Sequence, residues 1–137
     1  MAIQDKPALS VVVPCYNEEG NIAELLRRTD AACKPLFDQD YEIILINDGS
    51  RDETWRLISE HALASSHIIG INLSRNYGHQ LALTAGLEHC RGDLILILDA
   101  DLQDPPEYLG AMVTKINEGF DVVYGQRRAR AGETLFK

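Results

Sequence analysis

Residues 94–107 read LILILDADLQDPPE, and this stretch decides which fold the sequence predicts. Five apolar residues, 94–98, end directly in Asp99, Ala100 and Asp101. An unpaired carboxylate is costly to bury, so the two aspartates should leave the core where a buried strand ends. There they could meet water, a helix terminus or a cation. The stretch therefore predicts an interior strand whose polar end reaches the protein surface.

Similar apolar, β-branched runs recur along the chain and alternate with segments of helical period. The runs are 9–14, 41–48, 67–73, 93–101 and 120–125. Most are almost wholly apolar, which is typical of strands covered on both faces. The resulting order β-α-β-α-β-α-β-α-β predicts an α/β fold, with a mostly parallel sheet and helices on both faces.

The segments between these runs predict four helices. Their expected buried faces are Ile22, Leu25, Leu26, Thr29 and Cys33; Trp55, Ile58 and Ala62; Leu81, Ala85 and Glu88 or His89; and Leu109, Met112, Val113 and Ile116. The letters SRDE at 50–53 predict a capping box for the second helix. In DPPE, Asp104 is expected to cap the fourth helix, with Pro105 at its first position and Glu107 three residues after the cap.

Ligands of open parallel sheets bind beyond the carboxyl ends of the strands. Three polar loops occupy that place here: PCYNEEGN at 14–21, NDGSRDE at 47–53 and DADLQD at 99–104. The pair Asp48–Gly49 is also typical of a hairpin. The capping box and helical period that follow it argue against that interpretation. A binding site is therefore expected where the three loops meet.

Asp99 and Asp101 are candidate metal ligands. On an extended chain they project to the same side, where two carboxylates repel each other unless a proton or cation intervenes. With the amide oxygen of Gln103 nearby, these oxygen ligands suit Mg²⁺ or Mn²⁺. A Mg²⁺ held by one or two carboxylates usually completes its shell with water and substrate phosphates. On spacing alone, the alternative is that both aspartates cap a helix or bind water.

The other two loops offer contacts for a nucleotide. Asp48 could accept a hydrogen bond from a base N–H or a ribose hydroxyl, and the alternative is a simple Asx-turn. Tyr16 could stack on a base and Glu18 could bind a sugar hydroxyl; the alternative is loop capping by Asn17 or Asn21. The sequence contains neither the G-x-G-x-x-G fingerprint of dinucleotide-binding proteins nor a P-loop.

Composition and charge exclude several classes of protein. The 137 residues, 45% hydrophobic and 25% charged, suit one globular domain. A net charge of -8 argues against a nucleic-acid partner, which usually requires a basic footprint. Three cysteines without C-x-x-C spacing predict a reducing compartment rather than a disulfide framework. No signal peptide is expected, and no apolar stretch approaches the roughly 20 residues of a membrane span.

The sequence resembles glycosyltransferase family 2 in four motifs taken together: VVVPCYNEEGNI, ILINDGSRDET, LSRNYGHQLALTAGL and LILDADLQDPPE. The resemblance runs from about Leu9 to Arg130 and is strongest to the polyprenyl-phosphate sugar transferases. It implies a GT-A type, Rossmann-like fold, a nucleotide-sugar donor (a UDP-sugar in first place) and inversion at the anomeric carbon. It also implies a polyprenyl-phosphate acceptor similar to undecaprenyl phosphate. A polysaccharide acceptor is the alternative within the family.

The resemblance also implies roles for individual residues. The expected nucleotide-binding residues are Pro14, Tyr16, Glu18, Ile46, Asp48, Asp99, Ala100 and Asp101, with Asp48 facing the base. The expected ligands of Mg²⁺ or Mn²⁺ are Asp99, Asp101 and Gln103. The expected contacts of the acceptor phosphate are Arg127, Arg128 and Arg130. The expected catalytic residues are Asp99, Asp101 and Arg127.

Such a transfer requires no obligatory base. As the glycosidic C–O bond breaks, the nucleoside diphosphate gains negative charge, which a bound divalent ion can stabilise as a Lewis acid. A lipid monophosphate is largely ionised near neutral pH because its second pKa is about 6. Its oxygen can therefore attack directly while arginines hold it in line. The alternatives are a non-catalytic nucleotide-sugar-binding module and a metal-dependent phosphohydrolase.

We expect residues 1–137 to form a single nucleotide-sugar-binding domain that is incomplete at its C-terminus relative to the family. Relatives in this branch are longer and usually carry membrane-spanning helices after the catalytic domain. The chain is therefore expected to be a piece of a longer protein, and a truncated product is the alternative. The complete protein is expected at the cytoplasmic side of the membrane, and this chain by itself is expected to be soluble.

Overall fold

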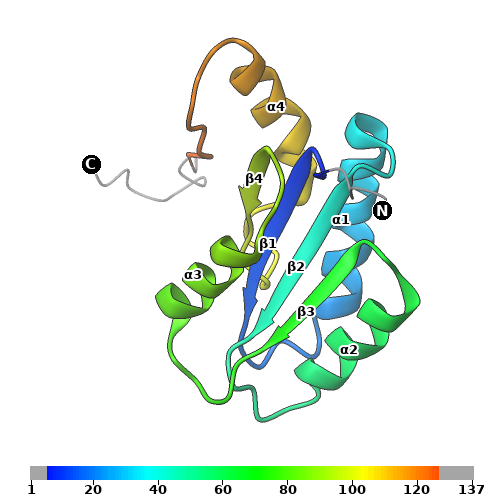
Figure 1. Ribbon diagram of the computed structural model, residues 1–137, viewed down its shortest axis with the longest axis vertical. Helices are drawn as coiled ribbons and strands as arrows, with labels where there is room; N and C mark the ends of the chain where they lie inside the picture. Colours follow the sequence, from blue (N-terminus) through cyan, green and yellow to red (C-terminus); the bar gives the residue numbers. More distant parts are fainter. Residues whose placement is uncertain (1–5, 127–137) are drawn as a thin grey trace, which may run out of the picture.

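The computed structural model describes residues 6–126. It contains one sheet of four strands: β1 (Leu9–Cys15), β2 (Tyr41–Asn47), β3 (Ile68–Asn72) and β4 (Leu94–Ile97). The strand order is β3-β2-β1-β4, and every neighbouring pair is parallel (Figure 1). The predicted parallel sheet is confirmed.

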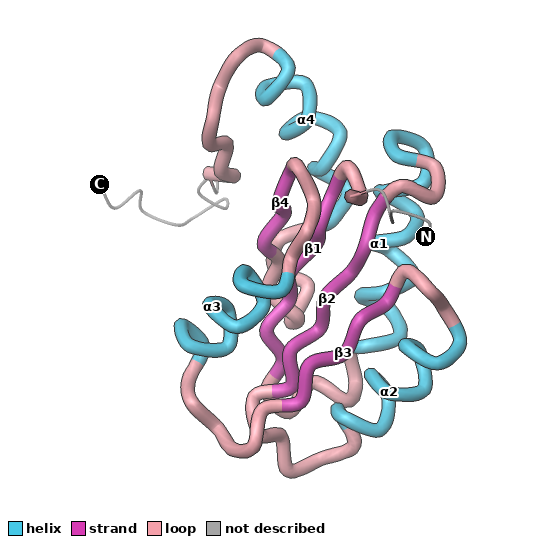
Figure 2. The backbone as a smooth tube through the Cα atoms, viewed as in Figure 1, coloured by secondary structure: helices cyan, strands magenta, loops and turns pink. Residues whose placement is uncertain are grey.

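Helices alternate with these strands along the chain (Figure 2). They are α1 (Ile22–Phe37), α2 (Thr54–Ala64), α3 (His79–His89), the short 3-10 helix η1 (Pro106–Tyr108) and α4 (Leu109–Asn117). Figure 1 shows α3 on one face of the sheet and α1 and α2 on the other. The predicted α/β arrangement with both faces covered is therefore confirmed. Within residues 6–126, every helix is too short or too polar to cross a bilayer.

Strands β1 and β2 are buried along their whole length, and their side chains alternate between two apolar clusters. Val11 and Val13 pack with residues of α1 and α2, whereas Val12 packs with Ala82 of α3. Burying one such side chain contributes about 1.5–3 kcal/mol. This double coverage explains why the runs are continuously apolar.

Helix α3 packs on the sheet through its smallest side chains. Its buried residues are Ala82 and Gly86. A Cβ atom placed on Gly86 would lie 2.5 Å from Val12 Cγ1 and 2.6 Å from Ile46 Cδ1. The helix therefore packs closely, but the predicted buried face is wrong by one position, because Leu81 is 56% exposed. Two small residues one turn apart decide the contact, and they outweigh the larger leucine.

Two strand predictions need correction. No strand forms at 120–125 within the described part of the chain, where Phe120, Val122 and Tyr124 are 56%, 79% and 82% exposed. An apolar run becomes a strand only where a neighbouring strand can pair with it, and the described residues supply none for this run. Strand β4 also ends at Ile97, earlier than predicted. Asp99 therefore follows the strand, and Asp101 lies in a turn next to Leu102, which has a positive φ of 63°.

Both predicted helix caps are also wrong. Helix α2 begins at Thr54, and it is Asp52, not Ser50, whose carboxylate accepts the Thr54 N–H, at 2.9 Å. At the fourth helix, Pro105 rather than Asp104 occupies the cap position of η1. Glu107 pairs instead with Arg28 of α1, with Nε–Oε1 at 2.7 Å. Tertiary partners compete here with the local capping pattern.

The loops after β1 and β2 are joined to each other by hydrogen bonds. The N–H of Asn17 donates to Ser50 Oγ at 2.9 Å, and the N–H of Glu18 donates to Thr54 Oγ1 at 2.8 Å. Asp52 accepts from the Thr54 hydroxyl and, at 3.3 Å, from the N–H of Glu19. Burial opposes ionisation of Asp52, but the hydrogen bonds from Thr54 and from the Glu19 N–H together outweigh it and lower the pKa of this carboxyl.

The close approach of α3 predicts the effect of a larger residue at position 86. Gly86→Val should lower the free energy of unfolding by about 1–3 kcal/mol, because the added methyl groups overlap Val12 and Ile46. Urea denaturation followed by circular dichroism would measure the change. Gly110→Ala is the control, since a Cβ there meets nothing within 4 Å. Equal stability of Gly86→Val and the wild type would contradict this packing.

The pKa of Asp52 predicts a pH-dependent contribution to stability. At about pH 7, Asp52→Ala should lower the free energy of unfolding by about 1–2 kcal/mol, because hydrogen bonds to a charged acceptor are lost. A lowered pKa means that this stabilisation is present above the usual value of 3.8 and is lost as the pH falls through the lowered value. The free energies of unfolding of the wild type and the variant, measured with urea at several pH values, should therefore become equal in acid. A difference that persists unchanged in acid would refute the assignment.

Candidate active site

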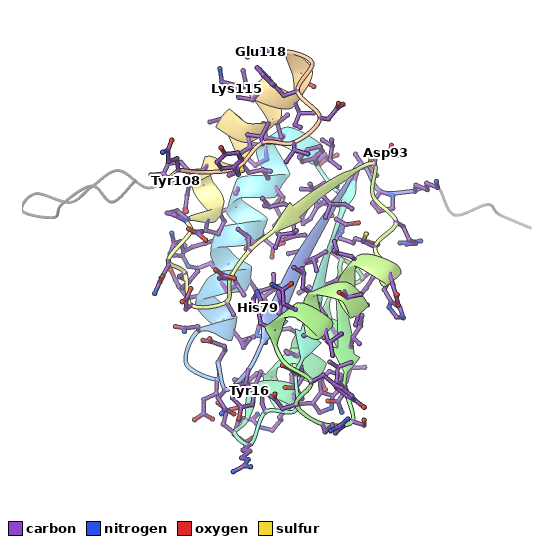
Figure 3. The ribbon with its side chains drawn as sticks, turned by 90° about the vertical axis from the view of Figure 1, so that its left-hand side faces the viewer. Tyr16, His79, Asp93, Tyr108, Lys115 and Glu118 are labelled. Carbon is purple, nitrogen blue, oxygen red and sulfur yellow. The ribbon has the colours of Figure 1, made fainter. Side chains whose placement is uncertain are left out.

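A cleft of about 410 Å³ lies at the carboxyl ends of the strands. Figure 3 shows two of its lining residues, Tyr16 and His79, in the half of the molecule opposite Asp93, Lys115 and Glu118. The lining residues that the sequence predicted for a nucleotide or metal are Pro14, Tyr16, Glu18, Asp48, Asp99, Ala100 and Asp101. The fold thus brings the loops after β1, β2 and β4 together in one cleft.

Two residues of the predicted set are placed differently. Ile46 is fully buried and packs in the cluster beneath α3, so its side chain does not reach the cleft. Gln103 is not among the lining residues; its backbone N–H donates to Asp101 Oδ1 at 3.2 Å. The predicted acceptor-phosphate residues Arg127, Arg128 and Arg130 lie outside the described residues.

Asp99 and Asp101 form the acidic part of the cleft. Asp99 is partly buried, Asp101 is exposed, and the Ala100 side chain between them is buried. His79 Nε2 lies 3.9 Å from Asp99 Oδ1. No group of three His, Cys, Asp or Glu side chains within residues 6–126 could hold a metal ion alone. The two accessible carboxylates instead fit a Mg²⁺ or Mn²⁺ ion whose coordination shell is completed by water and by phosphate oxygens.

Asp48 is a buried carboxylate at the end of β2, only 3% exposed. Its Oδ1 accepts the N–H of Tyr77 at 2.7 Å, and its Oδ2 accepts the N–H of Gly78 at 3.1 Å. These partners compensate the cost of burying the charge. They are remote in sequence, so Asp48 does not form a simple Asx-turn. Asn47 has that local role instead, since its Oδ1 accepts the N–H of Ser50 at 3.2 Å.

The loop after β1 supplies an aromatic ring and a carboxylate. Tyr16 is 44% exposed at the cleft, which leaves part of its ring accessible for stacking. Glu18 accepts a hydrogen bond from Asn21 Nδ2 at 2.8 Å, and Asn17 accepts the N–H of Arg51 at 2.8 Å. The two asparagines therefore build the loop, as the alternative interpretation expected, while Tyr16 and Glu18 still line the cleft.

Sequence reasoning missed four lining residues, namely Cys15, Asn76, Gly78 and His79. Burial, aided by the charge of Glu18, raises the pKa of the Cys15 thiol, so this sulfur stays protonated and is a poor nucleophile. Asn76 and Gly78 belong to the segment between β3 and α3, and His79 is the first residue of α3. This segment could have been predicted as part of the site, because it also follows the carboxyl end of a parallel strand, where ligands of such sheets bind.

Known proteins are similar to this chain in sequence. The family model for glycosyl transferase family 2 matches residues 10–137. Undecaprenyl-phosphate 4-deoxy-4-formamido-L-arabinose transferase of Klebsiella pneumoniae subsp. pneumoniae is 51% identical over 130 residues, which are 94% of this chain and 39% of the relative. An uncharacterized glycosyltransferase of Bacillus subtilis is 46% identical over 131 residues, or 93% of this chain and 39% of the relative. The chain thus spans about two fifths of the length of these relatives.

Solved structures agree with the sequence matches. A mannosyltransferase of Pyrobaculum calidifontis in complex with GDP-Man and Mn²⁺ has a TM-score of 0.65 and 25% identity, covering 80% of this chain and 32% of its own. TarS 1-349 of S. aureus in complex with UDP has a TM-score of 0.63 and 25% identity, with the same coverage. The GT-A type fold is confirmed. With this fold and the match to the family model over residues 10–137, the chain belongs to glycosyl transferase family 2.

Proposed function

We propose that this chain is the donor-binding part of an inverting glycosyltransferase. The enzyme moves a sugar from a nucleotide-diphosphate donor to a polyprenyl phosphate similar to undecaprenyl phosphate. The favoured donor is a UDP-sugar. One observation carries the proposal: Tyr16 after β1, Asp48 after β2, and Asp99 and Asp101 after β4 all line the same cleft. The relatives that act on undecaprenyl phosphate and the neighbours solved with UDP or GDP-Man support the choice of substrates.

The cleft offers distinct contacts to the two ends of a nucleotide sugar. Tyr16 presents a partly exposed ring for stacking on the base, and Glu18 lies beside it in the same loop. Asp48 has further lone pairs to accept a base N–H, although two backbone N–H groups already bind it. Asp99 and Asp101 would hold Mg²⁺ or Mn²⁺ together with the diphosphate. When bound, the ion acts as a Lewis acid on the leaving diphosphate.

The acceptor half of the reaction rests on chemistry rather than on a described residue. An ionised lipid phosphate supplies its own nucleophilic oxygen, so the enzyme needs to orient it and to neutralise charge repulsion. We assign these tasks to Arg127, Arg128 and Arg130, and among them we assign a catalytic role to Arg127. Because the acceptor is a lipid, we place the complete protein at the cytoplasmic side of the membrane.

A non-catalytic nucleotide-sugar-binding module is the second candidate. It is favoured by one observation, namely that the described residues lining the cleft include no Arg or Lys side chain to hold an acceptor phosphate. Assays of donor hydrolysis and of transfer to undecaprenyl phosphate, on this chain and on a longer protein that contains it, separate the candidates. Transfer by the longer protein supports the enzyme, and donor binding without any turnover by either supports the module.

Donor binding by this chain should depend on the metal and on the base. We expect calorimetry to show that a UDP-sugar binds in the presence of Mn²⁺ and at least about tenfold more weakly in its absence, because the diphosphate charge then faces Asp99 and Asp101. GDP- and CDP-sugars should bind more weakly than the UDP-sugar. Binding that is unaffected by Mn²⁺ would refute the metal site, and phosphate release from simple phosphomonoesters would favour a phosphohydrolase.

Asp101→Asn tests the metal assignment directly. Removing one carboxylate charge should weaken Mn²⁺-dependent UDP binding by about tenfold or more. Asp93→Asn is the matched control, because Asp93 is also exposed but precedes β4 at the opposite end of the molecule (Figure 3). The control should bind UDP like the wild type. If Asp101→Asn also did so, and retained transfer at saturating metal in the longer protein, the assignment would be wrong.

A further inference from the structure

The segment Arg75–His79 connects β3 to α3 and supplies three cleft residues, Asn76, Gly78 and His79. We call this segment the arm. We infer that Asp48 is a positioning residue: its buried carboxylate fixes the arm against the end of β2 and thereby sets His79 beside Asp99. This inference deepens the proposed function and rests on it for the identity of the ligand.

Three hydrogen bonds join the Asp48 residue to the arm. Its two carboxylate oxygens accept the N–H groups of Tyr77 and Gly78, at 2.7 and 3.1 Å. Its backbone carbonyl accepts from Asn76 Nδ2 at 3.1 Å. Tyr77 itself is 40% exposed and Asn76 is exposed, so little apolar burial fixes them. The charged acceptor is therefore the main hold on the arm, and such bonds are about twice as strong as neutral ones.

The backbone after Asp48 makes the contact close. Gly49 has a φ of +68°, and a Cβ atom built on it would lie 2.3 Å from Asn76 N and 2.5 Å from the carbonyl carbon of Arg75. Only glycine permits this approach of two backbones. Upstream, the N–H of Leu73 donates to the Asn47 carbonyl at 3.0 Å. The chain therefore follows the end of β2 from Leu73 into the arm as far as Gly78.

The arm leads directly into the acidic part of the cleft. Helix α3 begins at His79, immediately after Gly78, whose φ is +96°. His79 Nε2 then lies 3.9 Å from Asp99 Oδ1. Asp48 acts on this geometry through the backbone N–H groups of Tyr77 and Gly78, the two residues that precede His79. One carboxylate thus connects the part of the cleft assigned to the base with the part assigned to the diphosphate.

This connection distinguishes a positioning residue from a simple base contact. If Asp48 only recognised the base, its substitution would weaken binding of UDP and leave binding of Mn²⁺-pyrophosphate, which has no base, unchanged. If Asp48 fixes the arm, its substitution also weakens pyrophosphate binding, because His79 and Gly78 are displaced. The free protein should differ as well, in the protection of the two amides that Asp48 binds.

Amide hydrogen exchange of the ligand-free 137-residue chain, followed by NMR, is the first test. In the wild type, the amides of Tyr77 and Gly78 should be protected although the arm is largely exposed. In Asp48→Asn their exchange should be at least about tenfold faster, because the amide side chain replaces one acceptor oxygen with a donor. Ser74→Ala, which removes only the exposed contact with the Tyr77 hydroxyl, is the control and should leave both rates unchanged. Unprotected amides in the wild type would overturn the inference without any variant.

Calorimetry with Mn²⁺-pyrophosphate and with Mn²⁺-UDP is the second test. Asp48→Asn should bind both probes roughly tenfold more weakly than the wild type. Weaker binding of UDP alone, with wild-type amide exchange, would overturn the positioning role and keep the donor site. If the wild type bound neither probe, the proposed function would fail, and the exchange rates of Tyr77 and Gly78 would still decide whether Asp48 holds the arm.

Discussion

The parallel pairing of β1 with β2 is the constraint on which the rest of the structure depends. Their registers match over seven residues, from Leu9 opposite Tyr41 to Cys15 opposite Asn47. Because both strands are buried on both faces, their polar side chains, such as Ser10, Glu42 and Asn47, lie near the strand ends, where they find hydrogen-bonding partners. Parallel strands end at the same edge, so the loops after β1 and β2 meet there, and the short pairing of β1 with β4 adds the loop that carries Asp99.

The buried and exposed carboxylates of this fold have different tasks. At the amino end of the sheet, the buried Glu42 accepts from Ser10 Oγ at 2.9 Å and from Arg91 Nε at 3.1 Å, which fixes the start of β4 against β1 and β2. At the carboxyl end, Asp48 is equally buried and is satisfied by backbone N–H groups. Asp99 and Asp101 remain accessible in the cleft. Buried charges thus hold the frame, and accessible ones are available to a ligand.

Much of the fold could be predicted from local sequence, and the exceptions have physical causes. The first four strands follow from their continuous apolar runs, because they are covered on both faces. The buried face of α1, including Thr29 and Cys33, follows from helical periodicity, because one side of the helix is buried. The face of α3 could not be predicted in this way, since close approach through Gly86 matters more there than apolar size. The apolar run at 120–125 lacked a pairing partner among the described residues. The arm was missed because Asp48 binds it across about 30 residues of sequence, a contact that no local pattern encodes.

The central claim is that a divalent ion and a nucleotide diphosphate meet between the loops after β2 and β4. Paramagnetic line broadening of backbone amides by Mn²⁺, measured with UDP bound, tests it most directly. The account predicts that signals of residues 99–101 broaden first, that those of 76–79 broaden next, and that Tyr16 shifts on addition of UDP. Broadening centred near Asp93 or Glu118, at the far end of the molecule (Figure 3), with sharp signals at 99–101, would contradict it.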